Sequence, residues 1–431
     1  MQFDPPRGMR DFYPQDLPLR DRIFHAWTEA STRYGFLRFE PPVVESFDLL
    51  ARKAGEEVAQ QIYHFEDKSN RQLALRPEVT PSLVRMISAR AQEIVFPAKW
   101  WTIGQCFRYE RMTRGRKREH FQWNLDIIGE PSVQAEAWIL ACVTSALAAL
   151  GLASRDVRIH VNNRQVVSHL LCEAGVPQDR HIDVFMVLDK KGKVPAETLK
   201  EMLAEKGLTS SAAGDVMDLL GSESADNLSS GPLAASPAAE DVRRLLDLAA
   251  AMGFGDYLQF DSGVVRGLSY YTGTVFEGFD AARRFRAIFG GGRYDNLFAD
   301  MTGVARPAVG MGFGDVVIAE ILAELKGLAP AKPAVEVCVG MFDQSLSRDA
   351  ARVAAELVAA GIQTDLAFAA GKPAKFFTYA DRRGARFALF LAPDELREGA
   401  AAVKNMITGE QTTVPLSELP RWLLASLRPA L

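Results

Sequence analysis

Residues 107–129 hold the side chains whose types and spacing could do chemistry. They read FRYERMTRGRKREHFQWNLDIIG and predict two strands joined by a basic, glycine-containing loop. Apolar and polar side chains alternate in each strand, so one face packs on a core and the other turns away. The loop at 114–118 holds four cations in five residues. We expect an anionic ligand above the polar face; a solvated hairpin with a charged tip is the alternative.

Side chains from both strands and from the loop could face this ligand. Arginine suits a phosphate group, because its planar guanidinium can bind two phosphate oxygens at once. Amide and carboxylate side chains on the second strand would add hydrogen-bond partners. The strand residues in question are Arg108, Glu110, Gln122, Asn124 and Asp126, and the loop cations are Arg114, Arg116, Lys117 and Arg118.

Residues 76–80 read RPEVT and are predicted to end a strand and open a helix at Thr80, a candidate N-cap. Two interpretations stay open for this segment. Arg76 and Glu78 could form a surface ion pair that contributes little. Alternatively, Glu78 and Thr80 could point into a pocket, where a carboxylate suits an ammonium group.

Residues 264–273 place Arg266 in the middle of an apolar stretch that is rich in β-forming residues. Burying that charge without a partner would be costly. Gly267 beside it allows backbone or ligand to come close. Tyr270 and Tyr271 are predicted at adjacent strand positions, which face opposite ways. One tyrosine would then pack in the core while the other lines a cavity.

Residues 290–295 read GGGRYD and are predicted to leave a strand through a turn that other groups approach closely. The run does not match the dinucleotide-binding glycine fingerprint, and the sequence has no phosphate-binding P-loop. A nucleotide must therefore be bound in another way. Arginines on an open sheet, with Arg293 among the candidates, are the evident means.

Several elements must position these residues. An amphipathic helix is expected at 18–36, a hairpin at 62–76, a helix from residue 80, a helix at 132–151 and a strand at 157–162. Residues 164–245 contain few aromatics and short helical patterns, which suggests an inserted helical module. Strands return at 258–280 and 284–297. After a linker, strands and helices alternate to the end, which predicts a compact α/β domain with a mostly parallel sheet.

The composition describes an ordinary soluble globular protein. The chain has 431 residues, 48% of them hydrophobic and 24% charged, and a net charge of −4. This charge excludes a generally basic nucleic-acid-binding surface, so a polyanion must meet local patches. The four cysteines fit buried thiols in a reducing compartment, and the six histidines lack metal-ligand spacing. We expect no metal site, no membrane span, no signal peptide and a cytoplasmic location.

Together these segments resemble the histidyl-tRNA synthetase family of class II aminoacyl-tRNA synthetases, over nearly the whole chain from Gly8 onward. The motifs that carry the resemblance are RPEVT (76–80), FRYER (107–111) with its downstream glutamine and aspartate, VRGLSYYTG (265–273) and GGGRYD (290–295). The resemblance implies an α+β fold. Its antiparallel six-stranded sheet would be flanked by helices and joined by a helical insertion and a C-terminal α/β anticodon-binding domain. The implied ranges are 1–163 and 246–326 for the catalytic core, 164–245 for the insertion, 327–333 for the linker and 334–431 for the last domain.

The resemblance also assigns roles to residues. Arg108 would contact the α-phosphate of ATP and Glu110 the adenine side, while Arg266 would lie by the α-phosphate and the histidine carboxylate. Pro42 matches the first class II motif, which forms a dimer interface. The residues implied around the histidine substrate are Glu78, Thr80, Gln122, Asp126, Arg266, Tyr270, Tyr271 and Tyr294.

This sequence departs from the family pattern at several positions. Ser269 stands where aspartate is usual, Asp126 where glutamate is usual, and the hairpin loop is altered at 112–113 and 120–121. The third class II motif normally ends Gly-Leu-Glu-Arg, but residues 314–317 read GDVV, so Val317 takes the place of the arginine. Arg116, Arg118 and Arg293 are the candidates to supply the missing charge.

The implied activity is that of a histidine–tRNA ligase. Such an enzyme joins histidine to ATP, which enters with Mg²⁺, releases pyrophosphate and passes histidine to its tRNA, and it acts as a homodimer. The alternative is a synthetase-like regulatory subunit that senses histidine and supports a phosphoribosyltransferase. The missing arginine favours this alternative, while Arg108, Arg266 and the C-terminal domain count against it. In that last domain, Lys372, Lys375 and Arg382 are the candidate RNA contacts; a solvated helix face explains them equally well.

Overall fold

The structure is a computed structural model that describes residues 3–52, 60–188, 194–219, 228–229, 233–234, 236–265, 270–328 and 335–428. The chain divides into two compact units. The first comprises Met1–Asp11 and Leu19–Ala329, and the second Phe12–Pro18 and Pro330–Leu431. Each unit has its own hydrophobic core. The domain and linker boundaries inferred from the sequence stay predictions.

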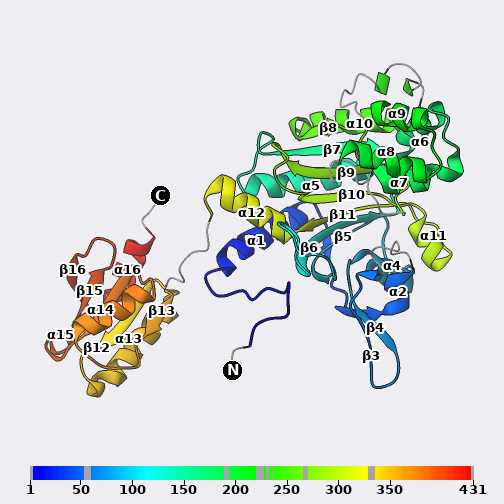
Figure 1. The fold of residues 1–431 in the computed structure, drawn as a ribbon. Helices are drawn as coiled ribbons and strands as arrows, with labels where there is room; N and C mark the ends of the chain where they lie inside the picture. The colour runs from blue at the N-terminus through cyan, green and yellow to red at the C-terminus, as the bar shows by residue number, and fades with distance from the viewer. Residues whose placement is uncertain are drawn as a thin grey trace. The chain divides into compact units, whose positions relative to one another are not determined.

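The first unit is built on an eight-stranded sheet in the order β1-β5-β6-β11-β10-β9-β7-β8 (Figure 1). Neighbouring strands from β5 to β7 pair antiparallel, while the edge strands β1 and β8 pair parallel. The expected antiparallel-rich sheet is therefore confirmed. Its strands are β1 Leu37–Arg38, β5 Ala98–Phe107, β6 Glu119–Ile128, β7 Val157–Asn163, β8 Leu258–Phe260, β9 Thr274–Asp280, β10 Phe289–Arg293 and β11 Ala308–Gly314.

Helices cover both faces of this sheet. The larger core packs one face against α1 (Leu17–Arg33), α5 (Gln134–Ala149), α10 (Pro237–Ala251) and α12 (Asp315–Lys326). Trp27 and Trp123 are fully buried there, with ring centroids 5.7 Å apart. The other face packs against α4 (Thr80–Ala89) and α11 (Leu297–Thr302). Figure 1 shows α1 and α12 on one side of the central strands and α4 and α11 on the other.

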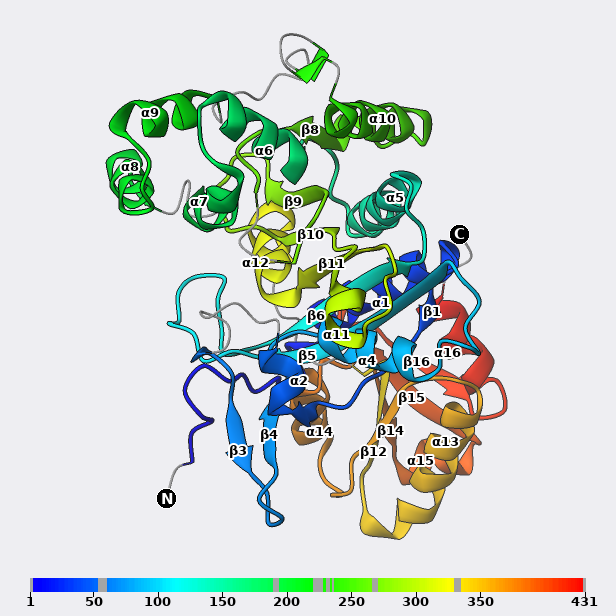
Figure 2. The same cartoon turned by 90° about the vertical axis from the view of Figure 1, so that its right-hand side faces the viewer.

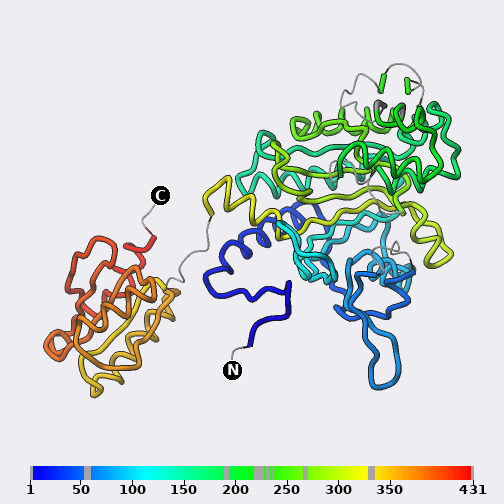
Figure 3. Tube along the Cα trace, viewed as in Figure 1, coloured from blue at the N-terminus to red at the C-terminus, as the bar shows by residue number. Residues whose placement is uncertain are grey.

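A small three-stranded sheet, ordered β2-β4-β3, adjoins α4. Its turn brings Asn70 to a φ of 60°, a left-handed conformation that asparagine tolerates, as expected for the predicted hairpin. Figure 3 shows this hairpin projecting from the rest of the unit. The elements are β2 Val44–Ser46, α2 Phe47–Ala51, β3 His64–Glu66 and β4 Gln72–Leu75.

The described residues of the predicted insertion form short helices that cluster at one end of the first unit (Figure 2). Leucine and valine side chains, such as Val184, Leu199 and Leu203, make a separate core there. The helices are α6 Arg164–Glu173, η1 Gln178–Arg180, α7 His181–Leu188, α8 Ala196–Glu205 and α9 Ser210–Leu219; η4 Gly255–Tyr257 follows α10. No helix in the described ranges is long and apolar enough to cross a membrane.

The second unit holds a five-stranded sheet ordered β13-β12-β14-β15-β16. The mostly parallel sheet predicted for it is wrong, because β15 and β16 form a hairpin that adds to β14 antiparallel. Only β13, β12 and β14 are parallel. The elements are β12 Val337–Met341, η5 Gln344–Leu346, α13 Ser347–Ala359, β13 Thr364–Leu366, α14 Pro373–Arg382, β14 Phe387–Leu391, α15 Pro393–Arg397, β15 Ala400–Asn405, β16 Gln411–Pro415 and α16 Leu419–Leu427.

Two local predictions need correction. Thr80 is not the N-cap of α4: Val79 holds that position, makes no side-chain cap, and leaves Thr80 as the first helical residue. The four cysteines are free thiols, but only three are buried, since Cys172 is exposed.

We expect Leu389→Ala to destabilise only the second unit. Leu389 is fully buried at the centre of β14 in that unit's own core. Truncation of such a leucine costs about 2–5 kcal/mol. Calorimetry should show two unfolding transitions, of which the variant lowers one. Leu125→Ala, at an equally buried site in the first unit, is the matched control and should lower the other. Equal shifts of both transitions would contradict independent units.

Candidate functional site

On the sheet face that α4 and α11 cover, polar residues of β6 lie beside glycines of β11. The register pairs Gln122 with Gly314, Asn124 with Gly312 and Asp126 with Gly310. A Cβ atom on Gly310 would lie 2.0 Å from Asp126 Oδ1, and one on Gly312 would lie 2.7 Å from Gln122 Nε2. Because real Cβ atoms do not come so close, a side chain at either position would displace the polar side chain beside it. The polar side chains of β6 therefore extend over bare backbone of the next strand.

Two buried carboxylates each accept a hydrogen bond from a tyrosine at this face. Tyr270 Oη donates to Glu78 Oε2 at 3.3 Å, and Tyr294 Oη donates a short bond to Asp126 Oδ1. Glu78 is 8% exposed and Asp126 1% exposed. The rings of Tyr270 and Tyr294 meet edge to face, with centroids 5.9 Å apart. Segments from α4, β6, β10 and the chain before β9 thus converge on one group.

Burial gives these carboxylates unusual proton affinity. Burial raises the pKa of Asp126 to about 7, with the Tyr294 bond lowering it and Glu78 raising it. Burial also raises the pKa of Glu78, although Arg108 and Tyr270 oppose the change. Asp126 Oδ2 has no hydrogen-bond partner among the described residues. A buried acceptor without a partner is costly, so the site suits a ligand with N–H donors.

The remaining predicted amino-acid contacts lie around this group. Tyr271 packs against Tyr270 at 5.0 Å, and both rings join the core under α4. They precede β9 instead of occupying strand positions, so the prediction that they lie in a strand is wrong. Thr80 opens α4 and is 8% exposed. Gln122 Nε2 donates to Asn124 Oδ1 at 2.9 Å.

The loop between β5 and β6 gathers arginines around Glu110. Arg116 Nε lies 2.5 Å from Glu110 Oε2, and Arg108 Nη1 lies 4.0 Å from Oε1. Arg108 Nε also donates to the Pro77 carbonyl at 2.9 Å, which ties it to the segment that carries Glu78. The charge of Arg108 lowers the pKa of Glu78. The cationic group and the carboxylate group are therefore neighbours.

Arg118 contacts the backbone of Glu110 but not its carboxylate: its Nε donates to the Glu110 carbonyl at 3.4 Å. Its guanidinium lies 3.9 Å from the centroid of the Tyr109 ring, and its Nη1 donates to the Arg7 carbonyl at 3.5 Å. Its backbone N–H donates to the Gly8 carbonyl at 3.0 Å. Arg118 thus holds the N-terminal segment against the loop, which leaves its predicted role toward ATP untested.

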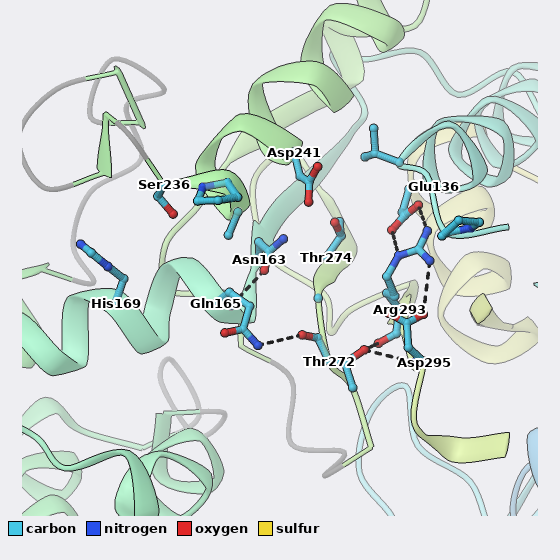
Figure 4. A pocket seen from close by; sticks show the side chains of 15 residues that line it. Glu136, Asn163, Gln165, His169, Ser236, Asp241, Thr272, Thr274, Arg293 and Asp295 are labelled. Carbon is cyan, nitrogen blue, oxygen red and sulfur yellow. Dashed lines mark hydrogen bonds and ion pairs between the residues drawn. The ribbon is translucent and has the colours of Figure 1, made fainter. Parts of the chain in front are cut away.

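Arg293 lies on the opposite face of the sheet from Asp126. It pairs in register with Val309, whose side chain belongs to the core on the α5 side. Paired residues of antiparallel strands point to the same face. Its guanidinium binds both carboxylate oxygens of Glu136, at 2.6 and 2.7 Å (Figure 4). The structure therefore does not bring Arg293 to the loop arginines.

Figure 4 shows the pocket of about 520 Å³ that surrounds this ion pair. It lies among the starts of α5, α6 and α10 and the start of β9. Its lining residues include Glu136, Asn163, Gln165, His169, Asp241, Thr272, Thr274, Arg293 and Asp295. None of these is a predicted substrate contact except Arg293.

Arg266 and Ser269 lie outside the described residues, so the predicted role of Arg266 is untested. Val317 is described: it lies in the first turn of α12, is 7% exposed and packs in the main core. Within the described ranges, no group of three or more His, Cys, Asp or Glu side chains could hold a metal ion.

Sequence reasoning missed a buried ion-pair group at the start of β6. Arg10 Nε lies 2.6 Å from Glu119 Oε1, and Arg10 Nη1 lies 3.0 Å from Asp315 Oδ2. Asp315 Oδ1 also accepts the backbone N–H of Phe121 at 2.9 Å. No local pattern links these residues, because they come from three distant segments. The glycines of β11 were also missed, although their spacing of two in GMGFG is a strand signal.

Comparisons with known proteins agree with this geometry. A structure titled histidyl-tRNA synthetase, from a Nostoc species, superposes with a TM-score of 0.82 over 99% of this chain and 100% of that chain at 22% identity. One titled ATP phosphoribosyltransferase regulatory subunit/histidyl-tRNA synthetase, from Bacillus halodurans, gives 0.74 at 21% identity over 90% and 98%. At such identity they show the fold alone. That fold, with its arginine-bearing hairpin, is that of a class II aminoacyl-tRNA synthetase.

Sequence relatives identify the family within this class of synthetases. Residues 8–314 match the family model described as histidyl-tRNA synthetase, and residues 334–426 match the anticodon binding domain. The chloroplastic/mitochondrial histidine–tRNA ligase of Arabidopsis thaliana is 43% identical over 417 residues, which cover 96% of this chain and 86% of the relative. The chain belongs to the histidyl-tRNA synthetase family, and the resemblance inferred from the motifs is confirmed.

We expect the buried Asp126 to make stability fall as pH rises from about 4 to 7. Its pKa is raised from 3.8 to about 7 in the folded protein, so between these values the unfolded chain loses the proton first. Stability present below pH 4 is then lost as pH passes through 7, by roughly 4 kcal/mol at most.

Urea unfolding of the first unit at several pH values, compared between wild type and Asp126→Asn, measures this effect. The difference in unfolding free energy between wild type and Asp126→Asn should change between about pH 4 and pH 7. Asp21→Asn, which removes a carboxylate with a 64% exposed side chain, is the control and should follow wild type. Parallel pH curves for wild type and Asp126→Asn would refute the assignment.

Proposed function

We propose that this protein is a histidine–tRNA ligase, which activates histidine with ATP and transfers it to the 3′ end of its tRNA. The observation that carries the proposal is the pair of buried carboxylates beside an arginine group on one sheet face. It supplies a site for a cationic amino acid next to a site for phosphate. Family membership over both parts of the chain supports the same activity.

The amino-acid site would recognise histidine by its nitrogens. The unpartnered Asp126 Oδ2 would accept an N–H of the imidazole, and Glu78 would accept the ammonium group. Tyr270, Tyr271 and Tyr294 would enclose the ring, with Thr80 and Gln122 at the margins. A site that hydrogen-bonds a polar side chain rejects apolar rivals strongly, because its own polar groups would otherwise stay unpaired.

In the first step, a carboxylate oxygen of histidine forms a bond to the α-phosphorus of ATP. The bond from that phosphorus to the bridging oxygen breaks, and the electron pair leaves with pyrophosphate. Positioning and charge neutralisation dominate such a transfer. Arg108 would neutralise the α-phosphate together with Arg266, and Glu110 would face the adenine. Arg116 and Arg118 remain proposed ATP contacts, of which Arg116 lies in the group around Glu110. Arg293 is dropped from the proposed contacts, because it binds Glu136 on the opposite face of the sheet.

Mg²⁺ would enter with ATP, bound mainly by its phosphates, as is usual for this ion. A homodimer through the first class II motif is also proposed. Pro42 is exposed there, next to the exposed apolar side chains of Leu37, Val43 and Val44. Apolar groups gathered at a sheet edge suit an interface. A cytoplasmic location stays a prediction, since the Arabidopsis relative's name places that protein in chloroplasts and mitochondria.

The alternative, a histidine-sensing regulatory subunit without adenylation, is not favoured by the comparisons. A curated relative named histidine–tRNA ligase matches over almost the whole chain, and residues 334–426 match an anticodon binding domain. ATP–pyrophosphate exchange with a panel of amino acids separates the two functions. Exchange with histidine alone supports the ligase, whereas histidine binding without exchange supports the sensor.

We expect Arg108→Ala to lower histidine-dependent exchange by about 10²–10³-fold, because this cation would contact the charge that develops at the α-phosphate. The melting temperature should change little, since the side chain is partly exposed. Arg90→Ala, which removes an exposed cation from the end of α4, is the control and should exchange normally. Near-normal exchange by folded Arg108→Ala protein would remove the proposed mechanism.

Three exposed cations of α14 and its N-cap test the proposed anticodon contact. Replacing them together with alanine should weaken tRNA charging while leaving exchange intact, because adenylation requires only the first unit. The matched control replaces three exposed arginines elsewhere in the second unit. Loss of both activities, or of neither, would contradict the assignment. The test set is Lys372, Lys375 and Arg382, and the control set is Arg348, Arg352 and Arg397.

A further inference from the structure

Val317, which stands at the position of the third-motif arginine, meets two other segments of the first unit. A methyl group added at Gly115, in the arginine loop, would lie 3.2 Å from Val317 Cγ2. The same methyl would lie 3.7 Å from Cδ and 3.9 Å from Cγ of Arg286. The aliphatic part of the Arg286 side chain, from the segment before β10, therefore reaches the place where the family has a charged arginine and this chain has Val317.

The charge of Arg286 lies near the arginine group of the loop. Partial burial lowers its pKa, Arg116 lowers it further, and Glu110 raises it. Both charges are thus near enough to act on Arg286. Arg286 is exposed and makes no hydrogen bond or ion pair with any residue that the structure describes. A ligand could therefore take up its hydrogen-bonding capacity.

Neighbouring arginines are engaged in ion pairs that fix this part of the molecule. Arg114 lies 3.4 Å from Glu320 and 2.9 Å from Glu324, which anchors the loop to α12. Arg284, two residues before Arg286, lies 2.7 Å from Glu324. The loop and the segment before β10 are thus tied to the same helix, which holds Arg286 beside the loop.

Charge balance indicates what this place can bind. Arg108 and Arg116 form ion pairs with Glu110, and Arg286 lies near enough for Arg116 and Glu110 to act on its charge, so three positive charges lie near one negative charge. Like charges gathered without neutralisation raise the energy of the free protein. A polyphosphate would neutralise the excess, and guanidinium groups bind phosphate oxygens through charge-assisted hydrogen bonds.

We propose that Arg286 replaces the missing third-motif arginine and binds the β- and γ-phosphates of ATP. This inference rests on the proposed function. When the bond between the α-phosphorus and the bridging oxygen breaks, the electron pair moves onto the pyrophosphate that Arg286 contacts. Its charge therefore stabilises the leaving group, while Arg108 acts at the α-phosphate.

The test compares ATP with AMP, which lacks the phosphates that Arg286 would hold. Calorimetric titration of Arg286→Ala should show ATP affinity reduced about 10- to 100-fold, since a charge-assisted hydrogen bond contributes about 1.5–3 kcal/mol. AMP affinity should stay within about twofold of wild type. Arg286→Lys should recover part of the ATP affinity, because it restores the charge without the planar fork.

Arg284→Ala is the matched control: it removes a cation from the same segment that already has a carboxylate partner. It should bind ATP and AMP like wild type. In exchange assays, Arg286→Ala should raise KM for ATP and leave KM for histidine unchanged. Unchanged ATP affinity, or equal losses for ATP and AMP, would overturn the inference. Wild-type exchange with histidine tests the proposed function separately, so the two can fail independently.

Discussion

The pairing of β6 with β11 is the constraint on which the rest of the site depends. One face of these strands carries Trp123 and Phe313 into the main core, where their rings lie 6.0 Å apart. The other face puts polar side chains beside glycines, and a Cβ atom at Gly310 would collide with Asp126. Because side chains alternate along a strand, the same register that places aromatic side chains in the core also places the polar side chains beside glycines on the other face.

Burial then sets the character of the carboxylates. Asp126 and Glu78 lie in a low-dielectric environment where their charged forms are disfavoured, and tyrosine hydroxyls satisfy only part of their hydrogen-bonding capacity. Arg108 stands close enough to Glu78 to offset part of this effect. Burying these carboxylates makes the folded protein less stable. A cationic or N–H-bearing ligand that binds them offsets this cost.

Ion pairs between distant segments hold the ends of these strands. Arg10 joins the N-terminal segment to Glu119 at the start of β6 and to Asp315 at the start of α12. Arg114 ties the loop to α12 through Glu324. Glu119 and Asp315 are largely shielded from solvent, so losing Arg10 would leave their charges uncompensated. The loop arginines are thereby presented around one carboxylate instead of spreading into solvent.

The sequence by itself determined the helices, the β5–β6 hairpin and most residues of the site, because alternation and short motifs are local properties of the chain. It could not reveal that Arg293 turns to Glu136 on the far face, or that Arg10 reaches Asp315, because strand order and register decide which distant residues meet. Nor could it assign β15 and β16 to an antiparallel hairpin. Tertiary structure alone decided which arginines are neutralised and which are not, since the partners of a charge depend on packing across the whole sheet.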